Sequence, residues 1–425
     1  GGFNAKAKTR YEEGFHVTML RIGDKFRLNQ DMLDMLAGEV RNPFVFASDL
    51  KSRVATLLQM HRRIVRETER RGVGYVVGGM RKILSRAEEM ARKRLLELND
   101  GIFRAVMFND DDVGGKLRLT RIPVTLFKEG DSITVLVQGV SPENRQGPMH
   151  ATWHLVRAAT AVYLFSYFYR GLPPNAGLLE SCRYLIEGPS IANATDEIAH
   201  GMGTSIAACV TNGCHVLGSK ALFSSPYRIA VQAPHSRNQN VFTFAGINRL
   251  GYNSANITGT CNAAGQGGRL DGDGERAIGF FWGPFTDAGE VEDMDTRLPH
   301  FVLSRKIDRN NHGYGMYRGG ASLVEVSTAC GDQGCFLNSW GSADKISHNP
   351  GIMGGYMGPP NPRFIIQGSD FFERTASGES IELDLNELIT KQKLSGEYRL
   401  EASGQPTEKF AEGDLMVFSM GGGGG

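Results

Sequence analysis

The sequence predicts an α+β protein in which a helical region is followed by a β-meander and a glycine-rich mixed α/β body. Apolar residues recur at helical spacing up to about residue 97, alternate with polar residues from about residue 102, and later lie in short runs broken by glycine. Strands and helices do not alternate regularly enough for a doubly wound sheet. These observations favour the α+β class.

The first predicted domain, residues 1–101, is mainly helical. Ser48 and Asp49 predict the N-cap of a long helical stretch over residues 48–97. The glycines at 71–79 interrupt the stretch, so we expect two helices that form a hairpin. Its many arginines are expected either on a solvated face balanced by glutamates or on a docking surface for an acidic partner subunit.

Residues 102–148 predict a β-meander. The runs KLRLTRIPVTLF and SITVLVQGV alternate apolar and polar side chains, as half-buried strands do. The sequence KEGD between them contains Gly130 and predicts a tight turn.

The third predicted domain, residues 149–425, is the glycine-rich body, and it opens with a helix expected over about 149–170. His150 and His154 stand four residues apart, so on a helix both side chains would leave one face and could share a metal ion. The segment HATWH lacks the glutamate of the zinc-protease motif, so structural or partner-facing roles for the two histidines stay open.

The cysteines predict neither a disulfide framework nor a clear zinc site. Cys209 and Cys214, followed by His215, and Cys330 with Cys335 have equal gaps, but structural zinc sites favour gaps of two to four residues. Six cysteines in 425 residues are typical of a reduced protein, which predicts a cytoplasmic location.

The charge balance argues against nucleic acid and membrane partners. Lys+Arg of 47 against Asp+Glu of 46 gives a net charge of +1. No apolar run reaches the roughly 20 residues that a membrane span needs. We therefore expect small-molecule and protein partners.

The stretch AGQGGRLDGDGE at 264–275 is a candidate site loop. It lacks the lysine of a phosphate-binding loop, the dinucleotide fingerprint and the terminal glutamate of an EF-hand. Its glycines permit close approach of main chain, so we expect the loop to present Asp271 as an acid or base and Arg269 as an oxyanion ligand. The alternative is that Asp271 caps a turn and Arg269 forms a surface ion pair.

Second-choice substrate-binding residues are Asn175, His235 and Arg237, which lie in other polar, loop-forming stretches.

Several motifs resemble, in order and spacing, the hydantoinase B/5-oxoprolinase B-type family over nearly the whole chain. Within the family, the regions 280–312 and 342–358 are most similar to subunits of the ATP-dependent acetone and acetophenone carboxylases. The matching segments are EEGFHVTMLRIG, RNPFVFASDLKSR, GVSPENRQGPMH, LPPNAGLLE, GGRLDGDGE, GYGMYRGGASLVE, GIMGGYMGPPNPR and the final glycine run.

The resemblance implies a subunit of a biotin-independent ketone carboxylase. A hydantoinase A-type ATPase subunit would bind ATP, a small third subunit is possible, and this chain would bind the ketone and bicarbonate side. Two other functions stay open: a subunit of an ATP-dependent cyclic-amide hydrolase acting on hydantoins or 5-oxoproline, and a non-catalytic assembly subunit.

The resemblance also implies a divalent metal (Mg, Mn or Zn) whose main ligands lie outside this chain. Family members carry histidine and aspartate ligands in a segment that precedes the part matched here. The sequence begins at Gly1 and ends in the run Gly421–Gly425, so we expect a piece of a longer polypeptide.

Overall fold

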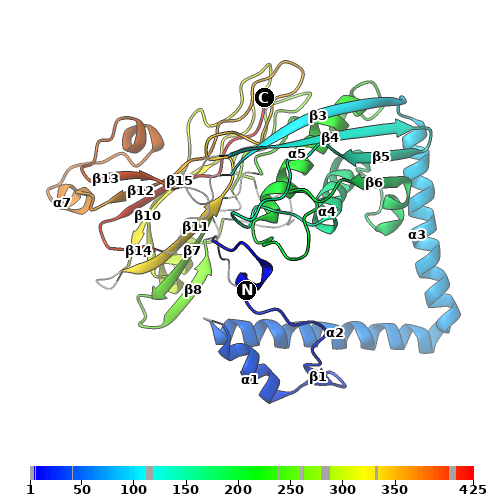
Figure 1. The fold of residues 1–425 in the computed structure, drawn as a ribbon, viewed down its shortest axis with the longest axis horizontal. Helices are drawn as coiled ribbons and strands as arrows, with labels where there is room; N and C mark the ends of the chain where they lie inside the picture. The colour runs from blue at the N-terminus through cyan, green and yellow to red at the C-terminus, as the bar shows by residue number, and fades with distance from the viewer. Residues whose placement is uncertain are drawn as a thin grey trace.

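The computed structural model describes residues 4, 6–40, 42–111, 118–237, 240–258, 260, 263–278, 288–330, 334–401 and 408–425. It is a mixed α/β structure, which confirms the predicted class (Figure 1).

The N-terminal part is helical, as predicted, but the helices begin and turn at other residues. A short turn (η1, Arg10–Glu12) and a small hairpin (β1, Gly23–Asp24; β2, Arg27–Leu28) precede the helices α1 (Gln30–Gly38), α2 (Pro43–Arg71) and α3 (Val73–Leu96). Asn42, not Ser48 or Asp49, caps α2, because its side-chain oxygen accepts the Val45 N–H at 3.2 Å. The proline that follows suits the first helical turn, where its missing N–H costs nothing.

Helices α2 and α3 form a corner instead of a hairpin (Figure 1). A single residue separates them, Gly72, whose φ of 84° lies in the left-handed region that glycine adopts without strain. One residue allows no turn long enough for the helices to fold back on each other. We call residues 43–96, that is α2 and α3 together, the arm.

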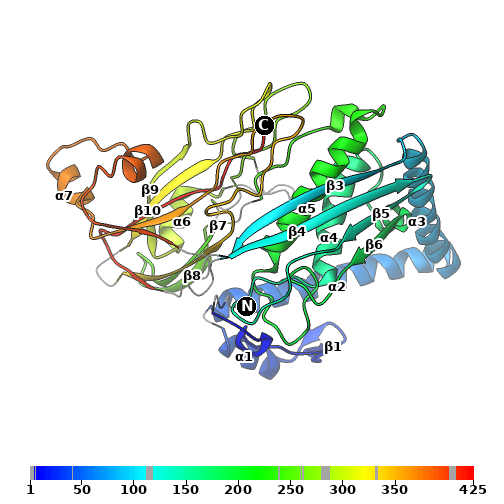
Figure 2. The ribbon, with the colours of Figure 1, turned by 45° about the horizontal axis from the view of Figure 1, so that its top comes forward.

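A four-stranded sheet forms the next layer, in the order β3-β4-β5-β6. The strands β4 and β5 confirm the meander predicted around Gly130, and β6 adds to β5 in parallel. Helix α5, buried along nearly its whole length, and helix α4 cover one face of this sheet (Figure 2). The bounds are β3 Gly101–Asp111, β4 Arg118–Glu129, β5 Ser132–Val137, α4 Trp153–Tyr163, η2 Leu164–Phe168, η3 Ala176–Ser181, β6 Cys182–Ile186 and α5 Gly203–Phe223.

Two further antiparallel sheets make the C-terminal body, in the orders β14-β11-β7-β8 and β13-β12-β15-β10-β9. Their facing side chains form a second core, in which the Phe242 and Phe418 ring centroids lie 4.3 Å apart. The bounds are η4 Arg228–Ala230, β7 Asn240–Ile247, β8 Asn253–Ile257, α6 Val291–Arg297, β9 His300–Ile307, β10 Leu323–Ala329, β11 Cys335–Gly341, β12 Arg363–Gln367, β13 Glu397–Leu400, β14 Glu408–Phe410 and β15 Leu415–Ser419.

Buried ionic groups join the first sheet to this body. The Asp110 carboxylate, at the end of β3, accepts N–H groups from Ala343 at 2.8 Å and from Lys345 at 2.6 Å. In the same region Arg363 donates to Asp344 at 2.6 Å, and both side chains are buried. The Asp110 bonds therefore connect the first sheet to the C-terminal body, and the Arg363–Asp344 pair stabilises that body beside them.

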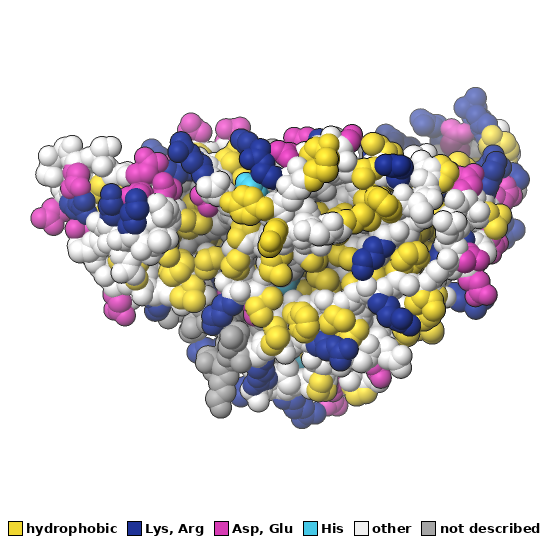
Figure 3. All heavy atoms as spheres, turned by 90° about the horizontal axis from the view of Figure 1, so that it is seen from above, with side chains coloured by type: hydrophobic (Ala, Val, Ile, Leu, Met, Phe, Trp, Pro, Cys, Tyr) yellow, Lys and Arg dark blue, Asp and Glu magenta, His cyan; other side chains and the backbone are white. Residues whose placement is uncertain are grey.

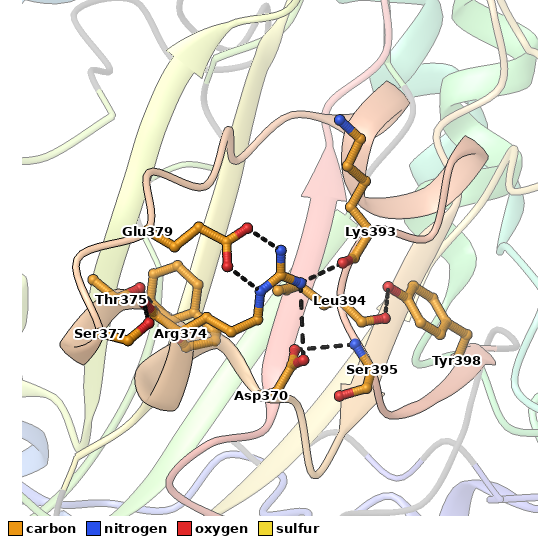
Figure 4. A network of polar contacts seen from close by, with 10 residues as sticks. Asp370, Arg374, Thr375, Ser377, Glu379, Lys393, Leu394, Ser395 and Tyr398 are labelled. Carbon is orange, nitrogen blue, oxygen red and sulfur yellow. Dashed lines mark hydrogen bonds and ion pairs between the residues drawn. The ribbon is translucent and has the colours of Figure 1, made fainter.

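A small lobe, α7 (Phe371–Ala376) and η6 (Asn386–Thr390), covers the outer sheet and is held together by one arginine. Arg374 bonds to Glu379 through Nε at 2.7 Å and also contacts Asp370, as Figure 4 shows. This network fixes the lobe over a core that includes Leu388.

Four glycine-rich segments pack closely against one another, with backbone atoms in direct contact. The Gly268 N–H donates to the Gly424 carbonyl at 2.7 Å, and the Gly313 N–H donates to the Gly423 carbonyl at 2.8 Å. A Cβ added at Gly423 would lie 1.9 Å from the Gln266 carbonyl oxygen. Only glycine fits at such a distance, so the glycine content reflects packing. The segments are 265–268, 313–320, 351–358 and 421–425.

No helix in the described part of the chain is both long and apolar enough to span a membrane. The division into domains at residues 101 and 148 stays a prediction.

Candidate functional site

The loop 264–275 is an ion-paired turn at the surface. Arg269 contacts Glu275 at 2.9 Å and Asp271 at 3.8 Å, and all three side chains are exposed to solvent. Asp273 pairs with Arg318 at 2.9 Å, and the Arg318 N–H and guanidinium lower the pKa of the Asp273 carboxyl. The geometry matches the surface ion pair that the sequence left open, and catalytic roles for Asp271 and Arg269 stay predictions.

The glycines of this loop place it directly against another segment with predicted site residues. The Ala233 N–H donates to the Gly268 carbonyl at 2.8 Å, and the Ser236 N–H donates to the Gly265 carbonyl at 2.9 Å. The loop therefore lies directly beside residues 233–237, which include His235 and Arg237. The structure brings these two residues into a single buried cluster.

The cluster contains two histidines, two tyrosines and an arginine. The His215 ring centroid lies 4.4 Å from that of Tyr167, 5.2 Å from that of Tyr163 and 5.3 Å from that of His235. The Tyr167 hydroxyl is hydrogen-bonded to His235 Nε2. Arg237 is fully buried beside these groups. We call Tyr163, Tyr167, His215, His235 and Arg237 the buried cluster.

Local structure explains how these side chains meet. Tyr163 ends α4, and Tyr167 follows in a π-helical turn, which shifts the helix register by one residue and often marks functional sites. His215 lies on α5, where Gly218 leaves room for the Tyr163 hydroxyl. The extended segment before β7 supplies the histidine and the arginine.

Burial sets the protonation states of the cluster. It lowers the pKa of His215 and His235 well below the usual value, and the positive charge of Arg237 lowers both further. Burial also lowers the pKa of Arg237, to about 10, and raises that of Tyr167. At neutral pH the imidazoles are therefore neutral, the phenol is protonated and the guanidinium is charged.

This combination can move a proton and stabilise an anion. A neutral imidazole bonded to a tyrosine hydroxyl can accept or relay a proton. A buried guanidinium stabilises a carboxylate, carbonate or enolate oxygen strongly, because little water screens it. Neither ring nitrogen of His215 has a hydrogen-bond partner among the described residues, which is unusual for a buried polar group.

The two predicted metal-binding histidines do not share a helix face. Helix α4 begins at Trp153, so His150 precedes it and is buried, with Nδ1 3.0 Å from the Ala199 carbonyl and Nε2 accepting the Asn144 N–H at 3.1 Å. His154 is exposed, and its ring is tilted against that of Trp153 with the centroids 3.7 Å apart. The spacing argument was wrong because the helix starts at Trp153, four residues later than expected, so His150 lies outside it.

No group of three or more His, Cys, Asp or Glu side chains able to hold a metal occurs among the residues that the structure describes. The predicted substrate ligand Asn175 is half-buried and caps η3, because its side-chain oxygen accepts the Gly177 N–H at 2.9 Å.

Three members of the buried cluster were missed from the sequence. His215 was considered only as a neighbour of Cys214 in a zinc motif, and Tyr163 and Tyr167 were read as part of an apolar helix. Their only sequence signal is two polar rings four residues apart in an otherwise apolar segment. The contacts of the two tyrosines with His215 and His235, which lie 48 to 68 residues later, depend on the tertiary fold.

The loop tips beside the candidate loop are apolar. Tyr314, Met316, Tyr356 and Met357 are exposed, and the Tyr356 N–H donates to the Tyr314 carbonyl at 2.7 Å, so the two loops are adjacent. The view of this face from above shows hydrophobic side chains gathered near its middle (Figure 3).

Comparison with known proteins identifies relatives along the whole chain. The family model described as hydantoinase B/oxoprolinase matches residues 1–425. The acetophenone carboxylase delta subunit of Aromatoleum aromaticum is 29% identical, with 100% of this chain and 62% of that protein covered. The chain therefore spans less than two thirds of the length of this relative.

Two solved structures share the fold. A nucleotide-free acetone carboxylase superposes with a TM-score of 0.90 at 19% identity, over 99% of this chain and 58% of the other. The ATP-dependent caprolactamase from Pseudomonas jessenii superposes with a TM-score of 0.77 at 15% identity, over 99% and 68% of the two chains.

Proposed function

Because the chain belongs to the hydantoinase B/oxoprolinase family, we propose that it is part of the B-type subunit of an ATP-dependent, biotin-independent ketone carboxylase. The observation that carries the proposal is the 29% identity to an acetophenone carboxylase subunit over the entire chain. The chain has no phosphate-binding loop motif of its own, so a hydantoinase A-type subunit would bind ATP. A small third subunit and a cytoplasmic location belong to the same proposal.

The buried cluster is proposed to serve the ketone and bicarbonate side of the reaction. Carboxylation of a ketone requires removal of a proton from the carbon next to the carbonyl and stabilisation of the resulting enolate or of a carboxylate oxygen. His235, hydrogen-bonded to Tyr167, suits the proton transfer, and Arg237 suits the oxyanion. Arg269 and Asp271 at the adjacent loop are proposed to orient the substrate as it enters.

A divalent metal (Mg, Mn or Zn) is proposed for the assembled enzyme, with its main ligands outside this chain. The donors present here fit a metal poorly: His150 uses both ring nitrogens in hydrogen bonds, and the buried cluster contains a positive charge that would repel a cation. No step is assigned to a metal at these residues.

The experiment is an assay of the complete complex, purified from its own operon, with ketones and cyclic amides, with and without bicarbonate. We expect ATP hydrolysis coupled to carboxylation of an aromatic or small aliphatic ketone, dependent on bicarbonate. Turnover of a hydantoin without bicarbonate, and none with any ketone, would contradict the proposal.

A cyclic-amide hydrolase is the second candidate, and the fold shared with caprolactamase is the observation that favours it. A non-catalytic assembly role is the third. It predicts that Arg269→Gln and Asp271→Asn, two substitutions of exposed side chains, leave turnover unchanged. The control is Arg121→Gln. Arg121 is an exposed residue of β4 and does not belong to the buried cluster or to the loop 264–275.

A further inference from the structure

Helix α3 of the arm has an apolar face that is buried at its C-terminal end and exposed at its N-terminal end. Along one face of α3 the apolar residues recur at helical spacing, and the C-terminal members Ala87, Ala91 and Leu95 are fully buried. The same face continues toward the N-terminus of α3 without cover. Its members are 40% to 66% exposed: Val73, Val77, Met80, Ile83 and Leu84, which we call the α3 stripe.

The described chain leaves the N-terminal part of this stripe largely open to solvent, because Val73 is 66% and Met80 52% exposed. Figure 1 shows the corner of α2 and α3 standing away from the sheets. Helix α2 has no buried residue and also exposes Leu57, Met60 and Ile64. Exposed apolar rows of this length mark interaction sites.

The arm is also strongly basic, unlike the rest of the chain. Residues 43–96 contain thirteen Arg and Lys against five Asp and Glu, a net charge of +8, whereas the whole chain has +1. Arg81 and Arg86 flank the α3 stripe on its two sides, and Arg70 and Arg71 lie at the corner. The ion pairs within the arm, such as Arg86 with Glu89 at 3.1 Å, neutralise only part of this charge.

We propose that the arm is a docking surface for a partner subunit that presents an apolar ridge between acidic side chains. The positive charge of the arm favours binding to an acidic partner. The apolar α3 stripe favours a folded protein over a nucleic acid, because a nucleic-acid backbone is charged and has no apolar ridge. The inference rests on the proposed function, in which this chain is one subunit of a hetero-oligomer, and it identifies the surface that receives the ATPase-type subunit.

Two other binding partners of the arm are tested in the same experiment. The first is a second copy of this chain, because its residues 288–425 contain nineteen acidic and twelve basic residues, a net charge of −7 that is opposite to the charge of the arm. A basic amphipathic helix is also suited to an anionic lipid surface.

The experiment measures binding of the hydantoinase A-type subunit from the same operon to the intact chain by interferometry. Met80→Asp with Ile83→Asp disrupts the stripe, and Arg81→Glu with Arg86→Glu reverses the flanking charge. Arg104→Glu with Arg121→Glu makes the same charge change on the exposed face of β3 and β4. All these side chains are exposed, so each variant should keep the melting temperature of the wild type.

We expect both arm variants to raise the Kd at least tenfold and the control pair to leave it within twofold. Raising the salt from 0.1 to 1 M should weaken the wild type more than the Arg81/Arg86 variant. Unchanged Kd values in the arm variants, or no binding by the wild type, would overturn the proposal.

Two further results would overturn it in favour of another occupant: arm-dependent self-association of the chain alone in sedimentation, or arm-dependent binding to phosphatidylserine vesicles. The proposed function is judged separately. A complex that forms through the arm but carboxylates no ketone would refute the function and leave the docking surface intact.

Discussion

Gly267→Ala should destabilise the protein, although it adds only one methyl group to a loop near the surface. The Cβ would lie 1.9 Å from the Ala233 carbonyl oxygen and 2.8 Å from the Pro234 carbonyl oxygen. Real contacts of this kind are at least about 3 Å, so the two segments must separate by roughly 1 Å. The separation also strains the hydrogen bond from the Ala233 N–H to the Gly268 carbonyl, now 2.8 Å.

The expected cost follows from these two changes. Forcing one extra carbon into a packed interior costs about 1–3 kcal/mol, and a weakened hydrogen bond adds about 1 kcal/mol. We expect a loss of about 3 kcal/mol and, for a chain of 425 residues, a melting temperature lower by roughly 3–4 °C. Because residues 233–237 include His235 and Arg237, carboxylation by the assembled complex should fall as well.

Gly272→Ala, in the same loop, is the matched control. Its Cβ would meet only the Arg269 guanidinium, at 3.4 Å, which can move. We expect a change within about 0.5 kcal/mol. Thermal unfolding of the two variants and the wild type, followed by intrinsic fluorescence, makes the comparison. If Gly267→Ala melts with the wild type, or if both variants lose equal stability, then close packing does not explain the glycines.

The remaining predictions concern buried polar groups. Burial lowers the pKa of His150 to about 4, below its unfolded value of about 6.5, so the folded protein keeps the ring neutral and loses stability as the pH falls from about 6.5 through 4. His150→Gln should therefore shrink the drop in melting temperature between pH 7.5 and 5; an equal drop would contradict this. Arg363→Met, which removes the partner of buried Asp344, should cost about 3–5 kcal/mol in urea unfolding, whereas Arg318→Met at an exposed pair should cost at most about 1 kcal/mol. Tyr167→Phe should reduce carboxylation at least tenfold and shift its pH profile while the melting temperature stays nearly constant; a changed melting temperature with an unchanged profile would indicate a structural role only.

Local patterns predicted the elements that depend on local rules. Alternation over β4 and β5 and the glycine between them were sufficient for the meander, because side chains on a strand alternate between two faces. The helical stretch of the arm was also predicted. Its start was misplaced because Asn42, six residues before Ser48, caps the helix, and Pro43 occupies the first helical position.

Only part of the candidate site could be predicted from the sequence, because its residues come from segments that are distant in the chain. His235 and Arg237 were selected from the sequence, but their partners Tyr163, Tyr167 and His215 are 20 to 74 residues away and meet them only when α4 and α5 pack together. The pair His150 and His154 failed for the opposite reason, because a spacing of four implies a shared face only inside a helix.

The sequence by itself determined the α+β class, the family, the helical character of residues 48–96 and the need for glycine in the loop 264–275. Tertiary structure alone decided which glycine segments touch, since residues 265–268 meet residues 421–425 across a gap of over 150 residues. It also decided that an ion-paired loop lies beside a buried cluster of histidine, tyrosine and arginine. Periodicity reports which face of one element is buried, but contacts between distant segments are selected by packing and hydrogen bonding of the whole chain.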